Sequence, residues 1–211
     1  MRDSSMGQCV KSGHVEEMSE HLRALRGRVT SEFLPEHGRV LEIGPGEVSF
    51  ARKETEYVGT NVSHRGDPTI LADGQALPFA DASFDAVIAT EVIEHVRYPY
   101  RLLREIRRVT KPTGRVLLST PNVATPTNRV ALALFGLFPD DRTLHDGQDV
   151  GHIHFFTRRH LLEAVRDSDF RVTREWDFLL QVLPKRYLYD TALERTFPNL
   201  TKQIMLELRP G

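Results

Sequence analysis

The stretch VLEIGPGEVSF, Val40–Phe50, decides the fold. Its first half is an apolar run with a single carboxylate, Glu42, and it breaks at Gly44, Pro45 and Gly46. Glycine at the end of a buried strand lets the backbone approach a ligand closely and adopt a positive φ without a side-chain penalty. In a parallel sheet, ligands bind beyond the carboxyl ends of the strands. We therefore predict a ligand site at this turn, made of bare backbone and one negative charge.

On both sides of this stretch, short apolar runs alternate with segments of helical spacing. Strands are expected in RVLEIG, EYVGTNV, TIL, FDAVIAT and GRVLLST, and later around residues 171–180 and 203–208. Helices are expected over His14–Leu34, Ala89–Val96, Pro99–Val109 and Arg158–Asp167. This alternation predicts an α/β fold, with a mostly parallel sheet that has helices on both faces.

The length of 211 residues favours one main domain. We expect residues 1–37 to form a tail and a helix that covers the site or makes a homodimer contact, and residues 38–211 to form the domain. Residues 122–156 show little strand signal, which predicts a lid or substrate segment. The apolar run Val130–Phe138 within it has two interpretations, a helix packed on the sheet or a wall for a hydrophobic substrate.

Composition excludes several classes of protein. The formal net charge of −1 argues against a broad nucleic-acid footprint. The single cysteine, Cys9, excludes an internal disulfide and a cysteine zinc cluster. The amino-terminal residues are polar, and no apolar run approaches the length needed to span a membrane. A cytoplasmic protein without a membrane partner is expected.

The charge at the glycine turn indicates the kind of ligand. A dinucleotide turn has the pattern G-x-G-x-x-G, but Ser49 takes the third glycine position here. Glu42 would repel a pyrophosphate and attract a cation. S-adenosylmethionine, which carries an ammonium and a sulfonium, suits both the bare backbone and the carboxylate.

Four segments resemble, in order and spacing, the successive motifs of class I S-adenosylmethionine-dependent methyltransferases, of the type 11/23 methyltransferase-domain group. The segments are VLEIGPGEVSF, YVGTNVS, ADGQALPFADASFDAVIATEVIEHV and LLREIRRVTKPTGRVLLSTPN, and they cover about Val40–Asn122. The resemblance implies a Rossmann-like seven-stranded sheet with an antiparallel final strand. A nicotinamide-binding or non-binding Rossmann relative is the alternative.

The resemblance also implies roles for individual residues. Glu42 would hold the methionine ammonium, and the turn would lie against the cofactor at Gly44 and Gly46. Asp73 would accept a hydrogen bond from the adenine amino group, with Gly74 and Gln75 beside the ring, and Thr90 would line the methionine end.

One position departs from the family pattern. Asn61 stands where an acidic residue usually binds both ribose hydroxyls. An amide can still pair with hydroxyls, but it lacks the charge-assisted contribution of about 1 kcal/mol.

The segment EVIEH places Glu91, Glu94 and His95 at i, i+3 and i+4. In a helix these three side chains would share one face. Two carboxylates and an imidazole suit a divalent cation such as Mg²⁺ or Mn²⁺. Similar segments in metal-free methyltransferases pack against the cofactor or cap a helix, so this alternative stays open.

Histidines in the later segment LHDGQDVGHIHFFT extend this constellation. E-x-x-E-H followed by a late histidine resembles small-RNA 3′-terminal ribose 2′-O-methyltransferases, which hold a metal with two Glu and two His, and quinone-pathway O-methyltransferases share the EH part. His152 would be the fourth ligand, with His154 as the substitute. His145, His154 and Glu91 are the candidate catalytic residues, with His145 preferred as general base because imidazole titrates near neutral pH.

A metal and a histidine favour an oxygen nucleophile, because a hydroxyl needs help to lose its proton. The expected substrate is therefore a small hydroxylated molecule, preferably a saccharide or another vicinal diol. The alternatives are a quinone or catechol, an RNA 2′-hydroxyl, or a non-catalytic protein that only binds the cofactor.

Overall fold

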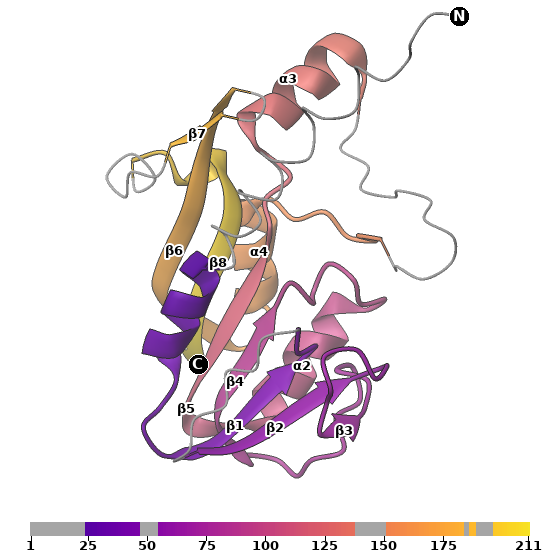
Figure 1. Cartoon of the computed structure of the whole chain (residues 1–211), viewed down its shortest axis with the longest axis vertical. Helices are drawn as coiled ribbons and strands as arrows, with labels where there is room; N and C mark the ends of the chain where they lie inside the picture. Colours follow the sequence, from indigo (N-terminus) through magenta and orange to yellow (C-terminus); the bar gives the residue numbers. More distant parts are fainter. Residues whose placement is uncertain (1–23, 47–54, 138–150, 184–185, 189–195) are drawn as a thin grey trace, which may run out of the picture.

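The computed structural model describes residues 24–46, 55–137, 151–183, 186–188 and 196–211 (Figure 1). Within these ranges the strands form one eight-stranded sheet in the order β3-β2-β1-β4-β5-β8-β6-β7. The strands are β1 (Gly38–Ile43), β2 (Thr55–Asn61), β3 (Ile70–Leu71), β4 (Phe84–Thr90), β5 (Thr110–Pro121), β6 (Phe170–Leu183), β7 (Arg186–Leu188) and β8 (Thr201–Pro210).

The strand directions match the expected architecture. The pairs β3–β2, β2–β1, β1–β4 and β4–β5 are parallel. The final strand β8 is inserted antiparallel between β5 and β6. The predicted seven-stranded, mostly parallel sheet with an antiparallel final strand is confirmed, and the eighth strand is a three-residue edge, β7, paired with β6.

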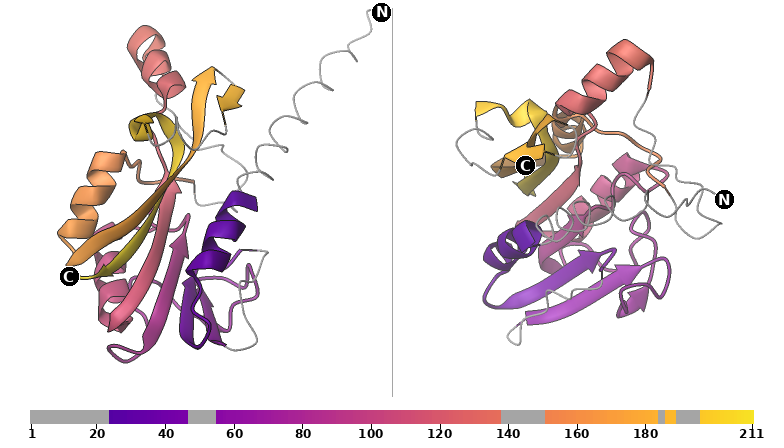
Figure 2. Two further views of the ribbon diagram at one scale, coloured as in Figure 1. Left: turned by 90° about the vertical axis from the view of Figure 1, so that its left-hand side faces the viewer. Right: turned by 45° about the horizontal axis from the view of Figure 1, so that its top comes forward.

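Helices cover both faces of the sheet (Figure 2). One face carries α2 (Pro99–Val109) and α4 (Arg158–Arg166), whose apolar side chains join the larger core cluster. The helix at residues 24–33 covers the other face, where Val29 and Phe33 pack against Ile88 and Leu117.

The spacing of apolar residues explains why α2 lies where it does. Leu102, Leu103, Ile106 and Val109 form one stripe, and all four are fully buried. Pro99 occupies the first turn, where its missing N–H costs no hydrogen bond.

The helix α3 (Pro126–Phe135) follows β5 and contacts β6 at one end of the sheet (Figure 1). Thr125 caps it by accepting a hydrogen bond from the Asn128 amide, and Gly136 ends it at φ 63°. No residue of α3 is buried, and Leu134 is 71% exposed. The run is therefore a helix in contact with strand β6 of the sheet, as one interpretation expected, but this contact buries none of its residues. Apolar residues fill consecutive positions of the helix rather than one stripe, so no single face is built for the sheet.

Among the described residues, no helix combines the length and the apolar character that crossing a bilayer requires.

Candidate functional site

The glycine turn follows β1 at the carboxyl edge of the parallel strands. Gly44 has φ +68°, and its amide donates a 2.7 Å hydrogen bond to the carbonyl of Thr60 on β2. A Cβ at Gly44 would lie 2.8 Å from Cγ2 of Val92, so the loop after β4 packs directly on this turn. Apart from its chain neighbours, no described residue has an atom within 4 Å of the Cβ position of Gly46. As far as the described residues go, the backbone there faces open space, as a cofactor cradle requires.

The loop after β2 also packs on the turn. Gly66 has φ +76°, and a Cβ there would lie 1.9 Å from the carbonyl oxygen of Pro45. Asn61 donates from Nδ2 to the carbonyl of Arg65 at 2.9 Å and so closes the loop. The sequence interpretation missed Gly66, although a lone glycine among polar residues in a short connection was a usable signal.

Glu42 carries its carboxylate into the sheet and is only 2% exposed. Its Oε2 accepts a 2.5 Å hydrogen bond from the Tyr57 hydroxyl on the neighbouring strand. Burial raises the pKa of Glu42, and the hydrogen bond from Tyr57 offsets part of that rise. A cation next to this carboxylate would stabilise its charged form. Tyr57 is a site residue that sequence reasoning missed.

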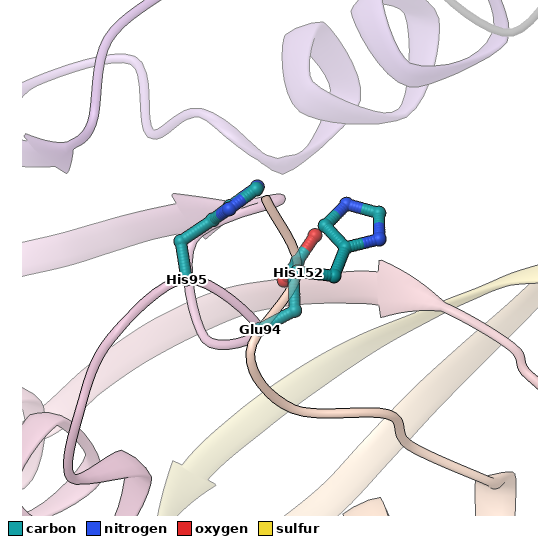
Figure 3. Close-up of side chains that lie close together, drawn as sticks. All are labelled: Glu94, His95 and His152. Carbon is teal, nitrogen blue, oxygen red and sulfur yellow. The ribbon is translucent and has the colours of Figure 1, made fainter. Parts of the chain in front are cut away.

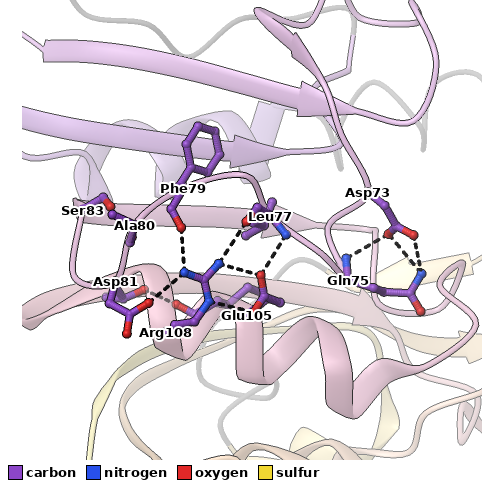
Figure 4. Close-up of polar contacts among 11 residues, drawn as sticks. Asp73, Gln75, Leu77, Phe79, Ala80, Asp81, Ser83, Glu105 and Arg108 are labelled. Atoms are coloured by element: carbon purple, nitrogen blue, oxygen red, sulfur yellow. Dashed lines mark hydrogen bonds and ion pairs between the residues drawn. The ribbon is translucent and has the colours of Figure 1, made fainter.

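The Asp73 loop is closed by its own side chains (Figure 4). Asp73 accepts hydrogen bonds from the Gln75 amide at 2.8 Å and from Gln75 Nε2 at 3.0 Å. Gln75 Oε1 accepts in turn from the amide of Tyr98 at 2.7 Å. Gly74 is buried, and a Cβ there would lie 2.9 Å from both Ile43 and Leu102. Gly74 therefore seats the loop on the core, and its expected place beside the adenine ring stays a prediction.

The segment after this loop is fixed to α2 by Arg108 (Figure 4). Its guanidinium donates to the carbonyls of Phe79 at 2.6 Å and Leu77 at 2.9 Å, and it pairs with Glu105 at 2.7 Å. This network holds in place the chain that leads from Asp73 to β4. Sequence reasoning did not assign Arg108 a role.

The segment EVIEH forms a turn, and the expected helix over Ala89–Val96 is wrong. Ala89 and Thr90 are the last residues of β4, where Thr90 is half-buried and pairs with Ser119 of β5. Glu91 then takes φ +56°, and the amide of His95 donates to the carbonyl of Val92 at 3.0 Å. A left-handed residue directly after the strand sharply redirects the chain, and α2 begins only at Pro99.

The side chain of Glu91 has partners outside the expected metal site. Its Oε1 accepts hydrogen bonds from Ser119 Oγ at 2.9 Å and Gln203 Nε2 at 2.7 Å. Its Oε2 lies 3.7 Å from Arg26 of the amino-terminal helix. The expected grouping of Glu91 with Glu94 and His95 on one face is therefore not observed. The side chain of Glu91 instead links the loop after β4 to β5, to β8 and to the amino-terminal helix.

Three of the four expected metal ligands do meet (Figure 3). Glu94, His95 and His152 each offer a ligand atom, and these atoms lie within 4.8 Å of one another. We call this group the Glu–His–His cluster. The two imidazole rings lie 4.8 Å apart between centroids. The backbone brings His152 here, because the Glu94 carbonyl accepts from the amides of Ile153 and His154, both at 3.0 Å.

Glu94 is 1% exposed, and one of its two carboxylate oxygens accepts a side-chain hydrogen bond. Its Oε2 accepts from Thr120 Oγ1 at 3.0 Å, and its Oε1 has no hydrogen-bond partner in the described part of the chain. Burial, followed by the nearby charge of Glu91, raises the pKa of Glu94 well above its ordinary value. A buried carboxylate oxygen without a donor, beside two imidazoles, fits a divalent cation. Two nitrogens and one oxygen suit Mn²⁺ or a later transition metal better than Mg²⁺, which prefers oxygen ligands.

The remaining candidate histidines lie elsewhere. His154 Nε2 is 3.3 Å from the carbonyl of Arg97, outside the Glu–His–His cluster. His145 lies outside the described residues.

A cavity of about 560 Å³, lined in part by Arg28, Pro35 and Arg115, lies at the amino ends of the strands, away from the glycine turn.

Comparison with known families and proteins agrees with this arrangement. The model of the methyltransferase-domain family matches residues 14–175. An uncharacterized methyltransferase of Mycobacterium sp. (strain JLS) is 37% identical over 106 residues, which is 44% of this chain and 42% of that protein. An uncharacterized protein of Methanocaldococcus jannaschii is 34% identical over 89 residues, 38% of this chain and 43% of that protein. The matches thus span less than half the length of these curated relatives.

Solved structures share the fold at low identity. An S-adenosylmethionine-dependent methyltransferase of Methanosarcina mazei has a TM-score of 0.61 at 16% identity, covering 86% of this chain and 96% of that chain. A methyltransferase of Thermotoga maritima, described as a possible histamine N-methyltransferase, has a TM-score of 0.60 at 19% identity, covering 93% and 96%. With its sheet order, its glycine turn and a family match over most of its length, the chain belongs to the methyltransferase-domain family of class I S-adenosylmethionine-dependent methyltransferases.

Proposed function

We propose that this protein transfers a methyl group from S-adenosylmethionine to a hydroxyl oxygen of a small polar acceptor, preferably a saccharide or another vicinal diol, with a divalent metal at the Glu–His–His cluster. The observation that carries the proposal is the buried Glu94 carboxylate, whose Oε1 has no hydrogen-bond partner in the described chain. Val92, two residues before it, packs against Gly44. The cluster and the glycine turn thus belong to neighbouring loops at one edge of the sheet.

The chain's own groups define how the cofactor would be held. Glu42 would face the ammonium, the backbone at Gly46 would lie against the cofactor, and the exposed carboxylate of Asp73 would accept from the adenine amino group. Asn61 would offer Oδ1 to a ribose hydroxyl. The bound cofactor supplies an electrophilic methyl group on a sulfonium, which is a good leaving group. The protein's task is then to orient the acceptor oxygen and remove its proton.

Removal of the proton from the acceptor hydroxyl is the harder part of the reaction. A metal held by Glu94, His95 and His152 would lower the pKa of a coordinated hydroxyl. A vicinal diol or hydroxy-carbonyl offers two oxygens to such a cation, whereas carbon and thiol nucleophiles need no metal of this kind. His154 remains the described candidate for the base, and His145 remains a candidate from the sequence.

A quinone- or catechol-type acceptor is the second candidate. Apolar side chains on α3, and one two residues after its end, are at least half exposed: Val130, Leu132, Leu134, Phe135 and Leu137. A hydroxylated aromatic ring with an apolar tail could contact them, while its adjacent oxygens faced the Glu–His–His cluster.

The metal test measures binding and transfer separately. Purified protein is stripped with chelator and titrated calorimetrically with Mn²⁺, and methyl transfer from labelled S-adenosylmethionine to a panel of saccharides and catechols is then assayed with and without the metal. We expect Mn²⁺ to bind and to restore transfer, and Glu94→Gln to abolish both. Glu163→Gln, an exposed site on α4, is the matched control and should change neither.

Normal transfer by chelated protein and by Glu94→Gln would exclude a catalytic metal. Absence of transfer to every hydroxyl acceptor, with metal and cofactor both bound, would contradict the oxygen-acceptor proposal.

A further inference from the structure

A basic–aromatic patch lies at the start of α2, in the segment RYPYRLLR at residues 97–104. Its exposed members are Arg97, Tyr98, Tyr100, Arg101 and Arg104. Tyr98 and Tyr100 are 47% and 48% exposed, so both rings are open to a ligand. The segment holds three positive charges and no acidic residue.

The charges of Arg97 and Arg101 are not neutralised by the described part of the chain. Both guanidinium groups contact the ring of Tyr98, with Cζ at 5.5 Å and 4.9 Å from its centroid. No carboxylate in the described ranges pairs with either arginine. In contrast, Arg108 pairs with Asp81 at 2.8 Å, and Arg159 pairs with Glu163 at 2.8 Å. The patch is therefore a local positive surface on a protein with a net charge of −1.

The backbone connects this patch to both halves of the site. The amide of Tyr98 donates to Gln75 Oε1 at 2.7 Å, next to the Asp73 loop. The carbonyl of Arg97 lies 3.3 Å from His154 Nε2, two residues after His152. The patch thus borders both the loop expected to bind adenine and the segment that supplies the Glu–His–His cluster. An acceptor bound at that cluster could extend over it.

We propose that the basic–aromatic patch binds the diphosphate and the base of a nucleotide-linked saccharide, so that the acceptor is a nucleoside diphosphate sugar. The inference rests on the proposed function. A guanidinium matches two phosphate oxygens in a planar, charge-assisted pair, and Arg97 and Arg101 provide two such groups, both next to the ring of Tyr98. An exposed aromatic ring such as that of Tyr100 stacks on a nucleobase. The small extent of the patch and the net charge of −1 favour one diphosphate over a polynucleotide.

The test uses protein saturated with S-adenosylhomocysteine, titrated calorimetrically with uridine diphosphate or inorganic pyrophosphate. We expect Arg101→Gln to weaken binding of both probes about tenfold, because a charge-assisted contact to phosphate is lost. Tyr100→Leu should weaken uridine diphosphate about fivefold and leave pyrophosphate unchanged, since only the base stacks. Arg174→Gln is the matched control, because Arg174 is also exposed and lies over an aromatic ring, that of Trp176 at 4.7 Å.

The inference is overturned if neither probe binds, or if both bind Arg97→Gln/Arg101→Gln protein as tightly as the unaltered chain. It is also overturned if a single-stranded oligoribonucleotide binds the patch more tightly than uridine diphosphate, because the partner would then be a nucleic acid. Unchanged binding of S-adenosylhomocysteine, together with transfer to a free sugar by the double variant, would leave the proposed function standing while this inference fails.

Discussion

The carboxylate of Glu42 is buried in the sheet on β1. The hydroxyl of Tyr57, on the neighbouring strand β2, donates a hydrogen bond to it. Burial disfavours the ionised carboxylate, and Tyr57 donates a single 2.5 Å hydrogen bond to it. The pKa of Glu42 is therefore above that of an exposed glutamate. A cationic ligand that needs the ionised form must lose affinity as the pH falls through this raised pKa, at a higher pH than an ordinary glutamate would dictate.

We predict that Glu42→Gln weakens binding of S-adenosylmethionine about tenfold at neutral pH, because the attraction between carboxylate and ammonium is lost. Between pH 7 and pH 5, the affinity of the unaltered protein should fall, whereas that of Glu42→Gln should change much less. Tyr57→Phe removes the hydrogen bond that favours the ionised form, so its loss of affinity should begin at a higher pH. Calorimetric titration across pH measures all three proteins. An unchanged pH profile in Glu42→Gln would show that another group controls binding.

At the scale of elements, the site is a set of loops held against one another at one edge of the sheet. The loop after β2 contacts the glycine turn through Gly66, and the loop after β4 contacts it through Val92. The Asp73 loop is seated on Ile43 and Leu102 through Gly74. These close approaches leave no room for a Cβ atom at Gly66 or at Gly74 unless the neighbouring atoms shift. The packing of the loops should therefore determine cofactor affinity as much as any single contact does.

Gly66→Ala and Gly136→Ala separate backbone strain from loop packing. Both glycines have a positive φ, +76° and +63°, so each alanine variant should lose about 1 kcal/mol of unfolding free energy from strain. Only the Cβ at position 66 meets backbone, 1.9 Å from the carbonyl oxygen of Pro45. At position 136 no described residue other than the chain neighbours lies within 4 Å of the Cβ. We expect a larger loss of stability and weaker S-adenosylhomocysteine binding for Gly66→Ala alone. Thermal unfolding with and without ligand tests this, and equal effects in the two variants would contradict the observed packing.

Two elements differ from what the sequence predicted, for the same physical reason. The i, i+3 and i+4 spacing in EVIEH predicted a helix with three side chains on one face. Glu91, however, has a left-handed backbone conformation and turns the chain directly after β4. An apolar run suggested a helix packed on the sheet, but α3 contacts β6 with its apolar side chains left exposed. Periodicity reports local preference, whereas these outcomes depend on where the preceding strand ends.

At the scale of the whole molecule, the order of the four motifs was enough to predict the sheet. Strand sequence, parallel pairing and the antiparallel final strand follow from it and are confirmed. The positions of Glu42, Gly44 and Asp73 at strand ends or in the following loops were also visible in the sequence. Tyr57, Gly66 and Arg108 were missed, because each acts through a partner that only the folded chain brings near.

The central claim is that the space over the glycine turn holds S-adenosylmethionine. Its most direct test is a calorimetric titration of the purified protein and of Gly46→Val with S-adenosylmethionine and S-adenosylhomocysteine. We predict that both ligands bind the unaltered chain. We also predict that Gly46→Val, whose side chain would meet none of the described residues beyond its chain neighbours, folds with unchanged stability but loses both ligands. If neither ligand gives heat with the unaltered chain, or if Gly46→Val binds both as tightly, the assignment of this space to the cofactor is contradicted.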